Sequence, residues 1–263
     1  MSKAYPTNIK QSSQTHLDVS YKKHVAVVEI NRSPVNALNL SLLNQLLATF
    51  IRLENNDNIH SIILRSAIPS IFSAGADIQE LSDFTTREIR RFVETGQNLC
   101  TVIENLKQPV IAVIQGHALG GGCEIALSCD LRIASEAASL GQPEIHLGLI
   151  PGWGGTQRLP KLLGKSRAMN VILLGNPINA LQAFDIGLIN YLVNSNQVDA
   201  FAVDLATKIA AQSTIASFGI KAAINASSTS SITAGLQEEI QQFIKCSLSK
   251  EHKIKTTAFL DRK

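Results

Sequence analysis

The chain has 263 residues, enough to bury a sizeable core in one or two domains. Its 45% hydrophobic and 17% charged residues exclude an intrinsically disordered chain. The formal charge of +3 comes from 24 basic and 21 acidic residues without a long run of one sign, so it gives little reason to expect nucleic acid or an anionic membrane as a partner, while a small anionic ligand remains compatible.

The cysteines and the N-terminal segment suggest a cellular location. The four cysteines form no CxxC pair, and residues 1–14 lack the apolar stretch of a secretory signal. The first arginine is Arg32, which argues against an Arg-rich organellar presequence, although a short atypical one stays an alternative. No apolar run reaches the roughly 20 residues that cross a bilayer. We therefore expect a soluble, cytoplasmic protein.

Apolar runs rich in β-branched residues predict strands along the first three quarters of the chain. They are His24–Ile30, Ser61–Arg65, Pro109–Gln115, Leu131–Ala134 and Ile189–Val193. Longer segments between several of them have helical spacing, so the sequence predicts an α/β fold. The clearest early helix begins near Asn39, and its apolar face is expected to pack on a sheet. That face comprises Leu42, Leu43, Leu46, Leu47, Phe50, Ile51 and Leu53.

The last quarter of the chain has a helical pattern. Segments Val198–Gln212 and Ile232–Leu248 have helical spacing with no convincing strand between them, and Ser227–Ser231 is a polar loop or helix break. We therefore expect an α/β core containing the functional site at residues 1–197, and a helical C-terminal region at residues 198–263.

The segment Pro109–Asp130, PVIAVIQGHALGGGCEIALSCD, predicts a strand, a glycine-rich turn and a short helix. Three consecutive glycines would let a ligand approach backbone N–H groups at a helix N-terminus, as in an oxyanion hole. Alternatively, the glycines only make a tight turn, and Glu124 is a carboxylate favoured by the helix dipole. A phosphate loop and a dinucleotide fingerprint are both excluded, because no Lys-Ser or Lys-Thr follows and the spacing is not GxGxxG.

Two further loops are candidates for the same site. Phe72–Ile78 is a small-residue loop after a strand that offers another backbone amide; alternatively it is an ordinary turn in which Asp77 caps the helix that follows. Residues 141–158 place Glu144 among apolar and glycine residues, surroundings that raise a carboxyl pKa and suit a general acid. A solvated loop residue is the other interpretation of Glu144.

Other reactive side chains fit structural roles better. His117, Cys123 and Cys129 match no common zinc spacing, so we predict no metal, and cysteines on an apolar helix are expected in the core. The sequence has no GxSxG motif, which disfavours a serine nucleophile. Asp130 is expected to end the helix or to pair with a nearby polar group.

Taken together, these segments resemble the enoyl-CoA hydratase/isomerase (crotonase) family. The motifs SAGADI, HALGGGCE, GQPE and IPGWGGTQRL occur in this order, and the match extends from SPVNAL at residues 33–38 to AFL at 258–260. The resemblance implies a spiral of ββα units, a C-terminal helical region used in assembly, and a homotrimer or a dimer of trimers, which is a hexamer.

The same resemblance implies roles for particular residues. The N–H groups of Ala76 and Gly121 would form an oxyanion hole for a thioester carbonyl. Glu124 would activate water for attack at the β-carbon, and Glu144 would protonate the α-carbon. Because the family's hydratases keep both glutamates, the resemblance implies an enoyl-CoA hydratase, a lyase that converts a trans-2-enoyl-CoA into a 3-hydroxyacyl-CoA in fatty-acid β-oxidation. It would need no cofactor, since CoA is part of the substrate.

For the CoA part of the substrate, the resemblance implies contacts along Ala74 and Ala76 to Gln79, which include Asp77 and Ile78. Gln79 departs from those hydratases that carry lysine there, which leaves the contacts of the CoA tail in doubt. Trp153 stands where small residues also occur in the family, so it bears on the acyl pocket or serves packing.

Four alternatives remain open. An enoyl-CoA isomerase, or a hydratase for a branched, methylglutaconyl-type acyl chain, would share the fold and the CoA site. A non-catalytic acyl-CoA-binding or scaffold subunit is a different class, and both intact glutamates argue against it. Some crotonase relatives bind RNA, but a charge of +3 without a basic stripe gives that little support.

Overall fold

The computed structural model describes residues 15–261, and within them six strands form a mainly parallel sheet. In spatial order they are β1 (Leu17–Lys22), β2 (Val25–Ile30), β3 (Ser61–Ser66), β5 (Val110–Ile114), β7 (Leu131–Ser135) and β10 (Tyr191–Val193). Only the first pair is antiparallel. The five strands predicted from the sequence are β2, β3, β5, β7 and β10, so these predictions are confirmed.

A second, smaller sheet is built from very short strands. In spatial order they are β4 (Ile71–Ser73), β6 (His117–Leu119), β8 (Ser139–Gly141) and β9 (Ile178–Asn179). The consecutive pairs β3/β4, β5/β6 and β7/β8 each give one strand to the large sheet and one to the small sheet, and helices follow each pair. The chain therefore winds as a spiral of ββα units, as expected.

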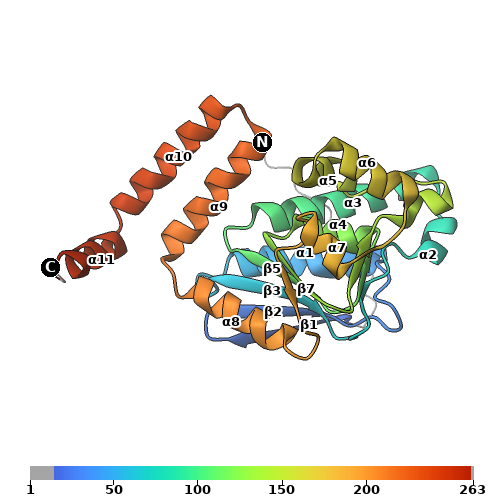
Figure 1. Ribbon diagram of the computed structural model, residues 1–263, viewed down its shortest axis with the longest axis horizontal. Helices are drawn as coiled ribbons and strands as arrows, with labels where there is room; N and C mark the ends of the chain where they lie inside the picture. Colours follow the sequence, from blue (N-terminus) through green and yellow to red (C-terminus); the bar gives the residue numbers. More distant parts are fainter. Residues whose placement is uncertain (1–14, 262–263) are drawn as a thin grey trace.

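Helices lie on one side of the large sheet, where most of the core lies (Figure 1). They are α1 (Leu40–Glu54), α2 (Ile78–Ser82), α3 (Thr86–Asn105), α4 (Gly121–Ser128), the 3₁₀ helix η1 (Pro143–Leu147), α5 (Gly155–Leu163), α6 (Lys165–Leu174) and α7 (Ala180–Asp185). The Asn39 side chain caps α1 by accepting a hydrogen bond from the Leu42 N–H at 2.9 Å. Most of the predicted apolar face of α1 is buried, but Ile51 is exposed.

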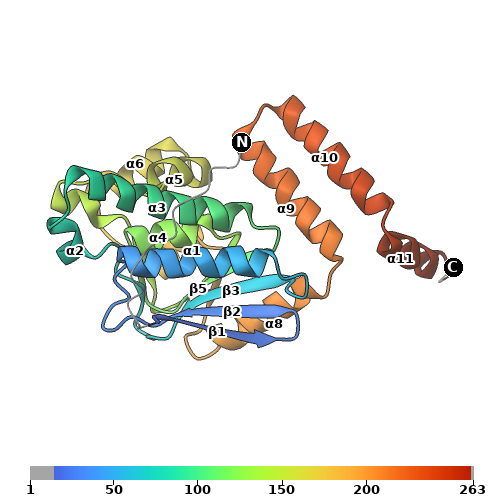
Figure 2. The same cartoon turned by 180° about the vertical axis from the view of Figure 1, so that it is seen from behind.

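Helix α8 (Val198–Ala210) covers the opposite face of the sheet (Figure 2). Its buried residues Val198, Ala202, Ala206 and Ala210 recur every fourth position, so they form one stripe that packs on the strands. The division at residues 197 and 198 stays a prediction, although α8, the first helix beyond it, packs on the sheet.

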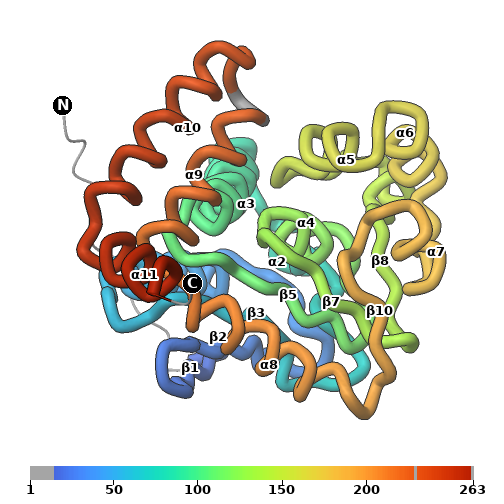
Figure 3. The backbone as a smooth tube through the Cα atoms, turned by 60° about the vertical axis from the view of Figure 1, so that its left-hand side comes forward, coloured from blue at the N-terminus to red at the C-terminus, as the bar shows by residue number. Residues whose placement is uncertain are grey.

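The remaining helices project from this core. Helices α9 (Thr214–Thr229) and α10 (Ile232–Ser247) pack side by side, and α11 (Lys250–Leu260) follows at their end (Figure 3). The expected break at Ser227–Ser231 is wrong for its first part, because α9 continues through Thr229. The Ser227 hydroxyl donates to the Ile224 carbonyl within the helix, and only Ser230 and Ser231 interrupt it. Among residues 15–261, no helix has both the length and the apolar character needed to span a membrane.

A buried lysine ties α9 to the core. Lys221 donates to the Asp130 carboxylate at 2.7 Å and to the carbonyls of Ile103 and Gln108 at 3.2 and 3.1 Å. Asp130 also accepts from the Val110 N–H at 2.7 Å, so the expected pairing of Asp130 with a polar group is confirmed. Burial raises the pKa of Asp130, and the lysine opposes that shift. These bonds orient α9 against the end of α3.

Candidate active site

A cavity of about 710 Å³ opens between the two glycine-containing loops, α3 and η1. Seven residues singled out in the sequence line it: Ala74, Ala76, Ile78, Gly121, Glu124, Glu144 and Trp153. Asp77 and Gln79 are not among the described residues that form its lining. The fold therefore gathers residues up to 79 positions apart, Ala74 and Trp153, around a single cavity.

The two loops meet closely because of Gly75. Its φ of +93° lies in the region that favours glycine, and a Cβ there would lie 2.8 Å from the Leu119 carbonyl oxygen and 3.2 Å from the Gly121 nitrogen. Any side chain at this position would push the loops apart. Gly75 therefore allows the backbone at Ala76 to lie beside the first turn of α4.

Backbone geometry leaves two N–H groups for this cavity. Ala76 forms a parallel bridge with Leu38, and the bonds of that bridge are made by its neighbours: the Leu38 N–H donates to Gly75 and the Asp77 N–H donates to Leu38. The N–H of Ala76 itself therefore lies on the other side of the bridge. Gly121 is the first residue of α4, so its N–H has no acceptor within that helix.

Glu124 lies in the first turn of α4 and is only 2% exposed. Its Oε1 accepts two hydrogen bonds of 2.7 Å, from the N–H groups of Trp153 and Gly155. Burial raises the pKa of Glu124, while these two amides and the Arg158 guanidinium act in the opposite direction. The carboxylate is thus held by a second loop as well as placed at its own helix N-terminus.

Glu144 lies in η1 and lines the same cavity as Glu124. Burial, with a smaller contribution from the charge of Glu124, raises the pKa of Glu144 to about 7. Gly120, at φ +50°, makes room for it, since a Cβ there would lie 2.9 Å from Glu144 Oε1. With its amide oriented so that the nitrogen, not the oxygen, points to Glu144, the buried Gln142 donates to both carboxylate oxygens at 3.2 Å. Glu144 is therefore not a freely solvated loop residue.

The family model described as enoyl-CoA hydratase/isomerase matches residues 20–263. The chain belongs to this family. It is 40% identical over 240 residues to the short-chain-enoyl-CoA hydratase of Clostridium acetobutylicum, covering 91% of this chain and 92% of that protein. It is 36% identical to the crotonyl-CoA hydratase of Syntrophomonas wolfei, covering 92% of this chain and 94% of that protein. The crystal structure of enoyl-CoA hydratase from Bacillus anthracis superposes on this chain with a TM-score of 0.91 at 37% identity. The superposition covers 95% of this chain and 97% of that one. The crotonase-like fold inferred from the sequence is confirmed.

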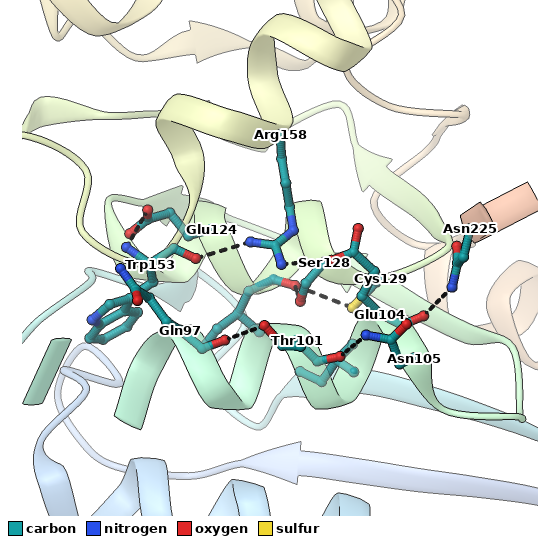
Figure 4. A network of polar contacts seen from close by, with 12 residues as sticks. Gln97, Thr101, Glu104, Asn105, Glu124, Ser128, Cys129, Trp153, Arg158 and Asn225 are labelled. Atoms are coloured by element: carbon teal, nitrogen blue, oxygen red, sulfur yellow. Dashed lines mark hydrogen bonds and ion pairs between the residues drawn. The ribbon is translucent and has the colours of Figure 1, made fainter. Parts of the chain in front are cut away.

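In this member of the hydratase/isomerase family, a polar network supports the loop that holds Glu124 (Figure 4). Arg158 Nη1 donates to the Trp153 carbonyl at 3.0 Å, and Arg158 Nη2 donates to Glu104 Oε2 at 2.7 Å. Trp153 therefore donates to Glu124 through its N–H and accepts from Arg158 through its carbonyl.

The sequence interpretation missed the roles of Arg158, Glu104 and Gln142. The first and last of them stand inside motifs that carried the family resemblance, IPGWGGTQRL and GQPE. Their position within those motifs could have marked Arg158 and Gln142 as functional. The pairing of Glu104 with Arg158 could not be recognised, because it spans 54 residues and leaves no local pattern.

The residues expected to contact CoA differ in exposure and in hydrogen bonding. The Asp77 side chain accepts from the Glu80 N–H at 3.4 Å as a helix cap and pairs with Arg32 at 2.8 Å, so the alternative interpretation as a cap is confirmed. Gln79 and Ile78 are exposed on α2. Their contacts with substrate stay predictions.

Cys123 and Cys129 are buried, as expected. Burial raises the pKa of Cys123 to about 12 and raises that of Cys129 as well, so neither thiol is ionised at neutral pH. His117 is exposed, and its Nδ1 lies 2.7 Å from the Ser139 hydroxyl, on the small sheet.

Proposed function

We propose that the protein is an enoyl-CoA hydratase, which adds water reversibly to a trans-2-enoyl-CoA to give a 3-hydroxyacyl-CoA. The observation that carries this proposal is the placement of two carboxyl groups, Glu124 and Glu144, in one cavity beside two loops with available N–H groups. Relatives named as hydratases, at 36% and 40% identity over most of the chain, support it.

The two loops would polarise the substrate. With the thioester carbonyl oxygen between the N–H groups of Ala76 and Gly121, the negative charge that develops during attack is stabilised by both donors and by the N-terminal end of α4. One such donor is typically worth roughly 3 kcal/mol of transition-state stabilisation. Gly75 serves this arrangement by allowing the loops to approach.

The two glutamates would handle the protons. Ionised Glu124 accepts one proton from water as the water oxygen bonds to the β-carbon, and protonated Glu144 gives its proton to the α-carbon. A pKa of about 7 leaves a large fraction of Glu144 protonated at neutral pH. Transfer of a proton from Glu124 back to Glu144 restores the starting state. Water and the thioester are the only reactants, so CoA enters as part of the substrate and no cofactor takes part.

The CoA part of the substrate would lie along Ala74, Ala76, Asp77, Ile78 and Gln79. Two of these, Ala74 and Ile78, line the cavity. Because Arg32 occupies the Asp77 side chain and the Asp77 N–H donates to Leu38, Asp77 would contribute through its backbone carbonyl. We assign the reaction to fatty-acid β-oxidation, in the cytoplasm. The free state of Cys100, Cys123, Cys129 and Cys246 suits a reducing compartment.

Purified protein mixed with crotonyl-CoA tests the activity. We expect rapid loss of the ultraviolet absorbance of the conjugated enoyl thioester, with 3-hydroxybutyryl-CoA as product. No loss of absorbance with crotonyl-CoA or with branched enoyl-CoAs would contradict the hydratase proposal, and conversion of a 3-enoyl-CoA alone would establish an isomerase instead.

We also propose that the chain assembles as a homotrimer or as a dimer of such trimers. Two separate surfaces expose large apolar side chains, and they lie on opposite sides of the molecule (Figure 3). One, on α9–α11, includes Ile220, Ile224, Phe243, Leu248, Ile254 and Phe259; the other, on α6 and α7, includes Met169, Leu173, Leu174, Leu181 and Phe184. Two different faces on one chain favour head-to-tail contacts, which close into a ring. Native mass spectrometry should give three or six chains per particle, and a monomer would contradict this.

A further inference from the structure

The indole of Trp153 forms part of the cavity wall. The side chain is 3% exposed and contributes to the cavity lining together with Phe92 and Val93 of α3. Its ring meets the Phe92 ring edge to face, with centroids 5.3 Å apart, and Phe92 in turn meets Phe84 at 5.8 Å. Trp153 is therefore the innermost member of a row of three aromatic rings beside the candidate site.

Two glycines make the space that the indole occupies. A Cβ placed on Gly96 in α3 would overlap the indole atoms Cε2 and Nε1, and a Cβ placed on Gly121 in α4 would overlap Cζ3. The ring thus bridges the gap between the two helices and touches the backbone of both. Gly121 also lines the cavity, and as the first residue of α4 its N–H has no acceptor within that helix. In the proposed function the indole therefore lies next to the place where the thioester carbonyl would bind.

The main chain of Trp153 fixes the ring in this position. Its N–H donates to Glu124 and its carbonyl accepts from Arg158, so the residue cannot shift without disturbing both bonds. The glycines contact the ring from two sides, and Phe92 contacts it from a third. The indole is therefore held by packing on three sides and by two hydrogen bonds of its own main chain.

We infer that Trp153, seated against Gly96, limits the length of the acyl chain, so that the substrates of this site are short-chain enoyl-CoAs. This rests on the proposed hydratase function. The carbonyl, the α-carbon and the β-carbon must lie between Gly121 and the two glutamates, and carbons beyond them extend toward the indole. Each methylene that does not fit a closed apolar pocket reduces kcat/KM by about 10- to 200-fold. The ring excludes chains that a small residue at position 153 would accept.

The test compares kcat/KM for trans-2-octenoyl-CoA with that for crotonyl-CoA in wild type, Trp153→Phe and Trp153→Ala. We expect the octenoyl-to-crotonyl ratio to rise at least about 10-fold in Trp153→Ala, and less in Trp153→Phe, which refills most of the space. Both substitutions keep the backbone N–H that binds Glu124. Both substrates are measured on the same preparation of each variant. A loss of folded enzyme therefore lowers both kcat/KM values equally and leaves their ratio unchanged.

Gly96→Ala provides the matched control. In wild type the new methyl group should displace the indole and lower crotonyl-CoA turnover, whereas in the Trp153→Ala background the same methyl group meets space and should have little effect. An unchanged ratio in Trp153→Ala, or wild-type hydration of octenoyl-CoA as fast as of crotonyl-CoA, would overturn the inference and leave the hydratase proposal standing. Failure of wild type to hydrate any enoyl-CoA would instead refute the proposed function.

Discussion

Replacing Glu124 or Glu144 with glutamine is expected to lower kcat for crotonyl-CoA hydration by about 10²- to 10⁴-fold, the usual contribution of a general acid or base. Glutamine cannot be ionised, so Glu124→Gln removes the base, and it supplies no carboxyl proton, so Glu144→Gln removes the acid. The loss of enoyl absorbance measures both effects. Thermal melting should show that both variants stay folded, because glutamine has nearly the size and shape of glutamate and, in Glu124→Gln, its oxygen can still accept the N–H bonds from Trp153 and Gly155.

Glu54→Gln is a suitable control for this pair. Glu54 is at the end of α1, far along the helix from the Leu38–Ala76 bridge, so the same chemical change there should leave turnover near the wild-type value. The double variant Glu124→Gln/Glu144→Gln should be little worse than the more damaged single variant, because the two residues act on one proton-transfer sequence. Turnover near the wild-type value in either single variant would remove that residue from the mechanism.

The sequence was sufficient to predict the large sheet but not the small one. Each predicted strand is an apolar run of at least four residues, long enough to stand out. The strands of the small sheet have two or three residues, such as Ile178–Asn179, and no periodicity can be recognised over that length. Their pairing depends on the winding of the whole chain. The polar segment that starts at Ser227 misled for a different reason, since a helix tolerates serine when its hydroxyl bonds back to a carbonyl, as that of Ser227 does.

For the candidate site, the motifs identified the residues but not their environments. Glu124 and Glu144 were found because each stands in a motif of unusual composition, and the raised pKa expected for Glu144 follows from the burial that the structure shows. The amides that hold Glu124, by contrast, come from a loop about 30 residues away. The sequence left Trp153 with two interpretations, and only the contact with Gly96 places its ring in the cavity wall.

Arg158 acts as a positioning residue, because it holds the carbonyl of Trp153, whose N–H donates to Glu124. Arg158→Met is expected to lower kcat by roughly 10-fold to 100-fold, because charge-assisted hydrogen bonds are worth about 1.5–3 kcal/mol each and the Trp153 loop loses its anchor. Arg158→Lys keeps a positive charge but cannot bond to the Trp153 carbonyl and to Glu104 in the same fork geometry, so its kcat should fall between those of Arg158→Met and wild type.

The pH dependence of kcat/KM separates positioning of Glu124 from a general loss of structure. As a base, Glu124 acts when ionised, so activity is present above its pKa and is lost as the pH falls through it. The Arg158 cation lowers that pKa, so in Arg158→Met the pKa should rise and the loss of activity should begin at a higher pH than in wild type. Arg158→Lys should show a smaller shift. Glu104→Gln, which keeps the arginine, should show no upward shift. If Arg158→Met reduces kcat/KM by the same factor at every pH, Arg158 has only a structural role.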